Sequence, residues 1–110
     1  MSDTVPLQID VNTLKAMRES GAEVALLDVR EPWEFDLCAI EGSSSIPLAS
    51  LPQRAGELPK DRQIVVICHH GVRSLNVANW LRNQGFEQAQ SLRGGIDAWS
   101  RDVDPAVARY

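Results

Sequence analysis

The stretch "QIVVICHHGVRSLNVANWLRNQ", residues 63–84, decides the fold. Residues 63–68 form an apolar, β-branched run of strand length, as expected for a strand that is covered on both faces. Residues 74–84 then read as a helix that begins at a Ser74 cap and has one apolar side, formed by Val77, Ala78, Trp80 and Leu81. A covered strand followed by an amphipathic helix is typical of a parallel α/β sheet.

Strands and helices alternate on both sides of this stretch. Before it, we expect a helix over residues 11–20 with Asp10 or Asn12 as cap and Gly21 as stop, and then a covered strand "VALLDV" over 24–29. A short helix from Pro32, a brief strand near Ile46 and a helical or irregular crossing over 48–58 follow. After it, we expect a helix stop at Gly85, a strand over 89–92, a turn at Arg93, Gly94 and Gly95 that opens a last helix, and an ordered or loosely packed tail over 103–110. This order predicts an α/β fold with a mostly parallel sheet, and residues 1–110 suit a single domain.

The composition is that of an ordinary globular domain. Hydrophobic residues make up 44% of the chain and charged residues 24%, and the net charge is −4. Nucleic-acid binding is therefore not expected, since it needs a concentrated basic face. The N-terminal stretch lacks the pattern of a leader, no apolar run is long enough to span a membrane, and two cysteines suit a reducing compartment, so we expect a cytoplasmic protein.

Cys68 stands where chemistry is expected in such a fold. Ligands of parallel sheets bind at the carboxyl ends of the strands, and Cys68 ends a covered strand just before a helix. The loop from His69 to Ser74 can curl its N–H groups around the sulfur, and Arg73 adds a positive charge, which together favour a nucleophilic thiolate. Gly71 gives the loop conformational freedom. We expect Cys68 to be exposed at the strand end, although free cysteines are more often buried packing residues.

Several spaced motifs resemble the rhodanese family of sulfurtransferases, over nearly the whole chain. They are "LLDVREPWEF" (residues 26–35), "IEG" (40–42), "IPL" (46–48), "CHHGVRS" (68–74), "GF" (85–86) and "LRGGIDAW" (92–99). One departure is Cys38-Ala39-Ile40, where the family often has Gly-His-Ile.

The resemblance implies a five-stranded sheet flanked by helices on both faces and a sulfur-carrying Cys68. By this resemblance the Cys68 thiolate takes sulfane sulfur from thiosulfate or a persulfide and passes it to cyanide, a thiol or a protein acceptor, without a cofactor. The substrate would bind in the loop formed by His69, His70, Gly71, Val72, Arg73 and Ser74. Asp28 and Arg30 match the family's Asp-x-Arg segment, and we expect Arg30 to pair with Glu34 in support of the loop.

Two other functions compete with sulfur transfer. A cysteine phosphatase or arsenate reductase typically has five residues between its Cys and Arg, whereas four separate Cys68 from Arg73. The tighter loop suits a persulfide sulfur better than a phosphoryl group. A rhodanese-like module that only binds a partner protein would not need Cys68 and Arg73, so their presence counts against that alternative.

The remaining candidates concern metal, disulfide and packing roles. Cys68, His69, His70 and Cys38 are possible metal ligands, but adjacent residues rarely converge on one tetrahedral centre, so no metal is expected. The two histidines either tune the thiolate or are solvated loop residues. Cys38 is expected to be a packing residue unless it lies near Cys68, where it could form a disulfide. The tryptophans Trp33, Trp80 and Trp99 are predicted to lie in the core.

Overall fold

A five-stranded, wholly parallel sheet forms the centre of the protein. The computed structural model describes residues 5–110, and residues 1–4, which begin the stretch expected to lack a leader, lie outside the described residues. The strands are β1 (Gln8–Ile9), β2 (Val24–Asp28), β3 (Ser44–Ser45), β4 (Gln63–Ile67) and β5 (Ala89–Leu92), in the spatial order β1-β5-β4-β2-β3. The parallel α/β prediction is confirmed. The two-residue strand β1 has too short a pattern to be predicted from the residues.

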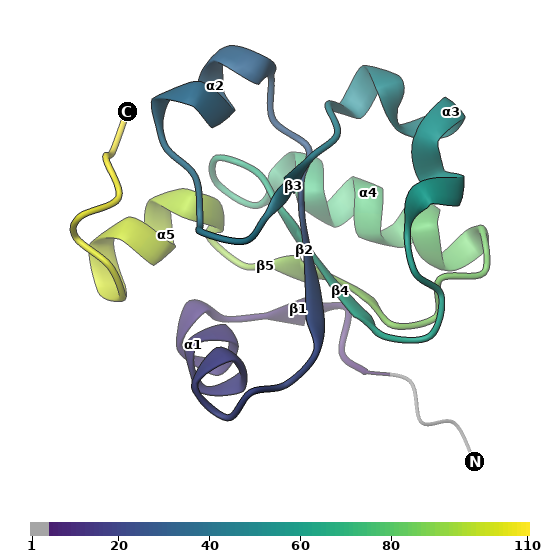
Figure 1. The fold of residues 1–110 in the computed structure, drawn as a ribbon, viewed down its shortest axis with the longest axis horizontal. Helices are drawn as coiled ribbons and strands as arrows, with labels where there is room; N and C mark the ends of the chain where they lie inside the picture. The colour runs from purple at the N-terminus through teal and green to yellow at the C-terminus, as the bar shows by residue number, and fades with distance from the viewer. Residues whose placement is uncertain (1–4) are drawn as a thin grey trace.

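Helices cover both faces of this sheet (Figure 1). They are α1 (Val11–Glu19), α2 (Pro32–Leu37), α3 (Leu51–Arg54), α4 (Val72–Asn83) and α5 (Gly95–Asp102), with the 3₁₀ turns η1 (Leu48–Ser50) and η2 (Ala55–Glu57) on either side of α3. Helices α1 and α5 lie together on one face, and α3 and α4 lie on the other. The chain thus has the expected three layers.

Strand β4 and Cys68, the residue that follows it, supply side chains to the cores of both faces. Ile64, Val66 and Cys68 point into the core beneath α3 and α4, whereas Val65 and Ile67 point into the core beneath α1 and α5. This alternation is the period of two expected of a strand, and the continuous apolar run arises because both faces are covered. Cys68 therefore points toward α4.

The sequence signals at helix ends are confirmed at three positions and wrong at one. Asp10 caps α1 by accepting from the Thr13 N–H at 2.7 Å, and Gly21 and Gly85 follow the ends of α1 and α4 with φ of 79° and 96°. Ser74 is not a cap. Helix α4 begins at Val72, because Gly71 at φ 101° turns the chain into the helix earlier, and this leaves Ser74 inside the first turn.

The predicted core positions of the tryptophans are correct for Trp99 only. Trp99 is buried on α5 and Trp80 is partly buried beside the core under α4. Trp33 is 62% exposed, which contradicts the prediction. The reason is that α2 is short and presents Trp33 outward, where its ring meets the Tyr110 ring edge-on with centroids 6.0 Å apart.

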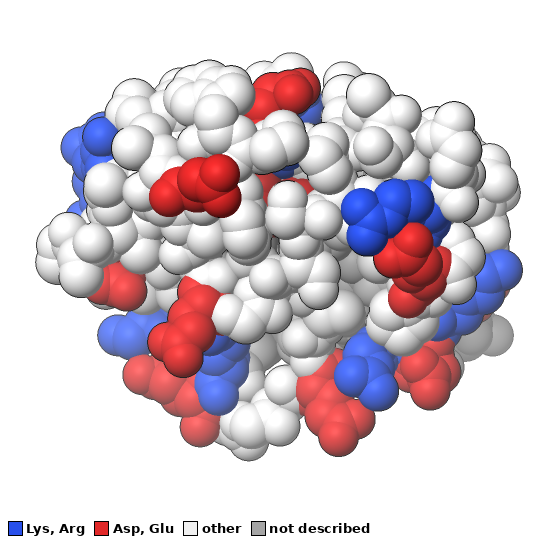
Figure 2. Space-filling view, turned by 45° about the horizontal axis from the view of Figure 1, so that its top comes forward, with Lys and Arg blue, Asp and Glu red and all other residues white. Residues whose placement is uncertain are grey.

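The surface over α2 and α3 is mainly uncharged. Figure 2 turns the top of Figure 1 toward the viewer, and the Lys and Arg side chains on that face mostly lie beside Asp or Glu. This face therefore carries no continuous basic patch. Among residues 5–110, no helix is long and apolar enough to cross a membrane.

Candidate active site

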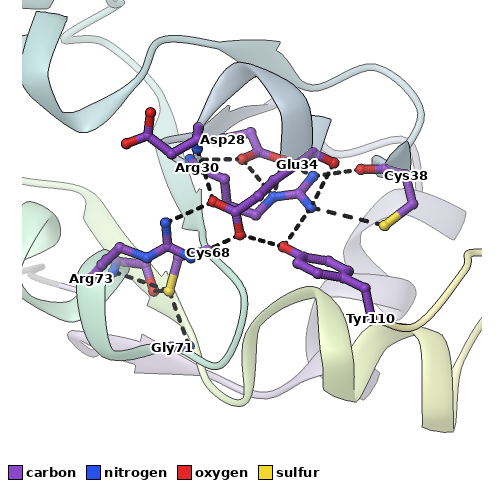
Figure 3. A network of polar contacts seen from close by, with 10 residues as sticks. Asp28, Arg30, Glu34, Cys38, Cys68, Gly71, Arg73 and Tyr110 are labelled. Atoms are coloured by element: carbon purple, nitrogen blue, oxygen red, sulfur yellow. Dashed lines mark hydrogen bonds and ion pairs between the residues drawn. The ribbon is translucent and has the colours of Figure 1, made fainter. Parts of the chain in front are cut away.

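The Cys68 sulfur lies in a cradle at the start of α4 (Figure 3). Sγ accepts hydrogen bonds from the N–H groups of Gly71 at 3.0 Å and Ser74 at 3.3 Å. The thiol also donates to Ser74 Oγ at 3.3 Å, and that hydroxyl is 2.8 Å from Ser91 Oγ on β5. Two backbone donors and the positive end of a 12-residue helix thus face the sulfur, an arrangement that stabilises a thiolate.

Cys68 is not exposed, contrary to the expectation from sequence. The residue is 1% accessible and belongs to the core under α4. The reason is that the loop folds over the strand end instead of leaving it open, since the sulfur is bonded from both Gly71 and Ser74. Val72, at the first position of α4, is 71% exposed and marks the outer side of the loop.

Gly94 and Gly95, at the start of α5, allow this helix to support the Cys68 loop. The N–H groups of Ile96 and Asp97 donate to the carbonyl oxygens of Cys68 at 2.9 Å and His69 at 3.1 Å. A Cβ atom at Gly95 would stand 2.4 Å from the Cys68 oxygen, so only glycine lets the two loops approach this closely. The pair was predicted only to open a helix, and its structural role in the loop was missed.

Arg73 is paired with a carboxylate from another helix. Its guanidinium donates to both oxygens of Glu34 on α2, at 2.9 and 3.1 Å, and its charge also interacts with Cys68. Glu34 is only 4% exposed, and the Arg73 hydrogen bonds lower the pKa of its carboxyl to about 2. Glu34 therefore stays ionised at neutral pH, and its charge offsets that of Arg73.

Arg30 does not form the predicted side-chain pair with Glu34. It is fully buried and forms an ion pair with Asp28, with Nη2 and Oδ2 2.7 Å apart. Its Nη1 donates to the main-chain oxygen of Glu34 at 3.2 Å, and its Nη2 donates to the main-chain oxygen of Cys38 at 2.6 Å. Arg30 thus fixes the backbone of α2, which leaves the Glu34 carboxylate free to turn to Arg73.

Tyr110 reaches the site from the C-terminal tail. Its hydroxyl donates to Glu34 at 2.6 Å and accepts from Arg30 Nη1 at 3.0 Å (Figure 3). Its ring stacks on His69, with centroids 3.9 Å apart and planes 6° apart. Burial and the Glu34 contact raise the pKa of Tyr110 to about 12, so the hydroxyl keeps its proton at neutral pH. No sequence motif pointed to this residue.

The two histidines differ in environment. His69 is half-buried between the rings of His70 and Tyr110, and burial and the neighbouring His70 lower its pKa, which favours the neutral imidazole. Its Nε2 is buried and has no hydrogen-bond partner among the described residues. His70 is exposed.

The possible metal ligands that come together differ from those considered in the sequence. Donor atoms of His69, His70 and Asp97 lie within 4.8 Å of one another. However, the two imidazoles are stacked with their planes only 23° apart, so their lone pairs do not converge, and Asp97 is 3.0 Å from Arg109. The other candidate, Cys38, has its sulfur 3.8 Å from Arg30 Nη1. Figure 3 shows Arg30 and Glu34 between Cys38 and Cys68, and both cysteines are free.

The geometry defines a class of protein, an α/β domain with a cradled thiol at the carboxyl end of the central strand of a parallel sheet. The chain belongs to the rhodanese family, because the family model described as rhodanese-like domain matches residues 10–102. It is 37% identical to a sulfurtransferase of Allochromatium vinosum, over 92% of this chain and 94% of that one. It is equally 37% identical to the thiosulfate sulfurtransferase GlpE of Vibrio cholerae, over 93% and 95%.

Solved structures agree with the fold. A rhodanese-related protein from Thermoplasma volcanium superposes with a TM-score of 0.82 at 30% identity, covering 96% of this chain and all of that one. The resemblance seen in the sequence motifs, both in family and in fold, is therefore confirmed.

Proposed function

We propose that this protein is a sulfurtransferase that carries sulfane sulfur as a Cys68 persulfide. The observation that carries the proposal is the cradle around Sγ, where the Gly71 and Ser74 N–H groups donate to the sulfur at the start of α4. Relatives of nearly the same length that are named sulfurtransferases support the reaction class. In this assignment Cys68 is the nucleophile, residues 69–74 bind the donor, and Asp28 and Arg30 support the loop.

The first half-reaction loads the sulfur. The Cys68 thiolate attacks the outer sulfur of thiosulfate, a new S–S bond forms, and the bond to the sulfonate group breaks. Sulfite leaves with the electron pair, and the persulfide anion remains on Cys68. The Ser74 hydroxyl accepts a hydrogen bond from the Cys68 thiol in the resting state. It can rotate to donate a hydrogen bond once the sulfur carries a negative charge. The backbone donors would stabilise the same negative charge.

The second half-reaction unloads the sulfur. A thiolate or cyanide attacks the outer persulfide sulfur, the bond between that sulfur and Cys68 Sγ breaks, and the Cys68 thiolate forms again. Thiolate acceptors become persulfides and cyanide becomes thiocyanate, so no external oxidant or reductant is consumed. A small thiol or a protein cysteine would serve as the acceptor, and no cofactor is required.

Intact mass spectrometry tests this proposal directly. After incubation with thiosulfate, the protein should gain the mass of one sulfur atom, and cyanide should remove it. The Cys68→Ser variant should gain nothing, whereas the matched Cys38→Ser variant should load and unload like the wild type, because Cys38 lies outside the cradle.

Two results would decide for the competing functions. A wild-type protein that never acquires sulfur from thiosulfate or a persulfide would favour a partner-binding module. Hydrolysis of a phosphate monoester at a rate matching thiosulfate turnover would favour a cysteine phosphatase, despite the four-residue spacing between Cys68 and Arg73.

We further propose that residues 1–110 act as a single catalytic domain in a reducing compartment such as the cytoplasm. Support comes from the family match over residues 10–102 and from the two free thiols.

A further inference from the structure

The cation beside the Cys68 thiol is already paired. Arg73 donates to both oxygens of Glu34 at 2.9 and 3.1 Å, in the two-pronged geometry that gives strong Arg–carboxylate pairs. Glu34 is almost fully buried, so water screens its charge poorly. A donor anion that approaches the thiol therefore meets an ion pair of zero net charge instead of a free guanidinium.

Tyr110 holds the carboxylate in this position. Its hydroxyl donates to Glu34 Oε2 at 2.6 Å, on the same oxygen that accepts from Arg73 Nη2. The hydroxyl is itself oriented by Arg30 Nη1 at 3.0 Å, and Arg30 is fixed by its buried pair with Asp28. Glu34 cannot turn away from Arg73 without breaking this contact.

The tail that delivers Tyr110 is anchored at several points. Val103, Val107 and Tyr110 pack against the core beneath α1 and α5, and Val107 accepts a hydrogen bond from Ser100 Oγ. Arg109 forms an ion pair with Asp97 at 3.0 Å. The tail lies beyond residues 10–102, the part of the chain that matches the family model.

We propose that Glu34 and its positioning residue Tyr110 set the charge selectivity of the Cys68 site, disfavouring dianionic sulfur donors relative to monoanionic ones. The inference rests on the proposed function and specifies its donor class. A dianion such as thiosulfate must compete with Glu34 for Arg73 and is repelled by the carboxylate. A donor with a single negative charge suffers about half of that repulsion, because Coulomb energy is proportional to charge.

Two small donors separate this effect from changes in the thiol itself. Thiosulfate is a dianion, and methanethiosulfonate is a monoanion in which a methyl group replaces one charged oxygen. The same thiolate attacks the outer sulfur of both, and the leaving groups are sulfite and methanesulfinate. Damage to the nucleophile or to the loop lowers both rates, whereas a change in local charge alters their ratio.

The experiment measures kcat and KM for both donors in the wild type and in Glu34→Gln, with cyanide as the acceptor. Removing the carboxylate charge should raise the kcat/KM of thiosulfate relative to methanethiosulfonate by roughly threefold to tenfold, mainly through a lower KM for thiosulfate. The gain should shrink at high salt, since dissolved ions weaken the repulsion between thiosulfate and the Glu34 carboxylate in the wild type.

Tyr110→Phe provides a second variant that keeps the ring on His69 and removes only the hydroxyl. Its ratio should rise in the same direction by roughly twofold, because Glu34 is released more often from Arg73. The matched control is Glu57→Gln, which also removes one carboxylate from a two-pronged pair, that of Arg54 with the exposed Glu57. Its ratio should equal that of the wild type.

The outcomes are distinguishable. An unchanged or lower ratio in folded Glu34→Gln would overturn the proposed selectivity and leave sulfur transfer intact. If Glu34→Gln does not fold, an unchanged ratio in Tyr110→Phe overturns it instead. If neither donor loads sulfur onto Cys68 of the wild type, the proposed function itself fails.

Discussion

Among residues 5–110, the Ser74 hydroxyl is the side-chain group that is hydrogen-bonded to the reactive sulfur. Its Oγ accepts from the Cys68 thiol at 3.3 Å and lies 2.8 Å from Ser91 Oγ. The sequence suggested a helix cap at this position, and the residue type is right for a different reason. A serine in the first turn of α4 places both an N–H group and a hydroxyl on the sulfur.

We predict that Ser74→Ala lowers thiosulfate turnover by roughly tenfold or more, because hydrogen bonds to charged groups contribute about 1.5–3 kcal/mol. Steady-state kinetics measure the loss, and persulfide should still form, since the backbone donors at Gly71 and Ser74 remain. The matched control is Ser91→Ala, which removes the neighbouring hydroxyl but no direct contact to sulfur. Equal losses in the two variants would contradict a direct role for Ser74.

Gly95 allows the backbone of α5 to lie directly against the backbone of the Cys68 loop. A Cβ there would come within 2.6 Å of the backbone of Cys68 and His69, and φ is 61°. We predict that Gly95→Ala lowers the free energy of unfolding by more than about 2 kcal/mol. It should also reduce the loading of sulfur onto Cys68, because the added carbon displaces the loop that holds the cysteine. Thermal denaturation and intact mass measure the two effects.

Gly56→Ala is the matched control for Gly95→Ala, because Gly56 has no atom within 4 Å of an added Cβ and no positive φ. It should change stability by less than about 1 kcal/mol. A stable, fully active Gly95→Ala protein would show that the loop adjusts to the extra carbon.

At the scale of elements, the site depends on a contact between α2 and α4. Glu34 and Arg73 are 39 positions apart, so their pairing could not be read from local spacing. The sequence instead suggested Arg30, four residues before Glu34, as the partner. Arg30 could not serve, because its guanidinium is committed to Asp28 and to carbonyl oxygens of α2 and Cys38. Local motifs thus located the Cys68 loop, whereas the ion pairs around it could be identified only from the folded structure.

The α2–α4 contact should make stability depend on pH. The pKa of Glu34 lies at about 2 in the folded protein, against an ordinary value of 4.5. A depressed carboxyl pKa stabilises the folded state above pH 4.5, and this contribution, on the order of 3 kcal/mol, is lost as pH falls toward 2. We predict that the stability difference between the wild type and Glu34→Gln shrinks between pH 6 and pH 3, as measured by urea denaturation.

Glu57→Gln is again the control for pH, since the Glu57 side chain is 57% exposed beside Arg54. Its stability difference from the wild type should remain small throughout the same range. A Glu34→Gln curve parallel to that of the wild type would mean that the Glu34–Arg73 pair contributes little to folding.

At the scale of the whole molecule, the parallel sheet brings the parts of the site to one edge. Strands β2, β4 and β5 are adjacent, and their carboxyl ends carry Asp28, Cys68 and the Gly94–Gly95 turn. The sequence predicted this edge from its covered strands. It could not predict the tail contact of Tyr110, because a single aromatic residue in a short tail without a helix or strand pattern carries no periodic signal.

The shared strand β4 should make the two faces of the sheet unfold together. Trp99 lies in the core beneath α1 and α5, and Trp80 lies beside the core beneath α3 and α4. β4 contributes Val66 to one core and Val65 to the other, so neither core can lose its packing without releasing the strand that supports its partner. Cooperative unfolding is expected when one element belongs to both cores.

We predict one common urea midpoint for both faces. With the exposed Trp33 replaced by Phe, Trp80→Phe leaves Trp99 as reporter and Trp99→Phe leaves Trp80. Within each variant, the fluorescence midpoint should coincide with the midpoint of far-ultraviolet circular dichroism. Fluorescence of one tryptophan that changes well before the helical signal would show that its face unfolds separately, and residues 1–110 would then not behave as one domain. Coincident transitions in both variants would show that β4, which ends just before the reactive cysteine, is released together with both cores.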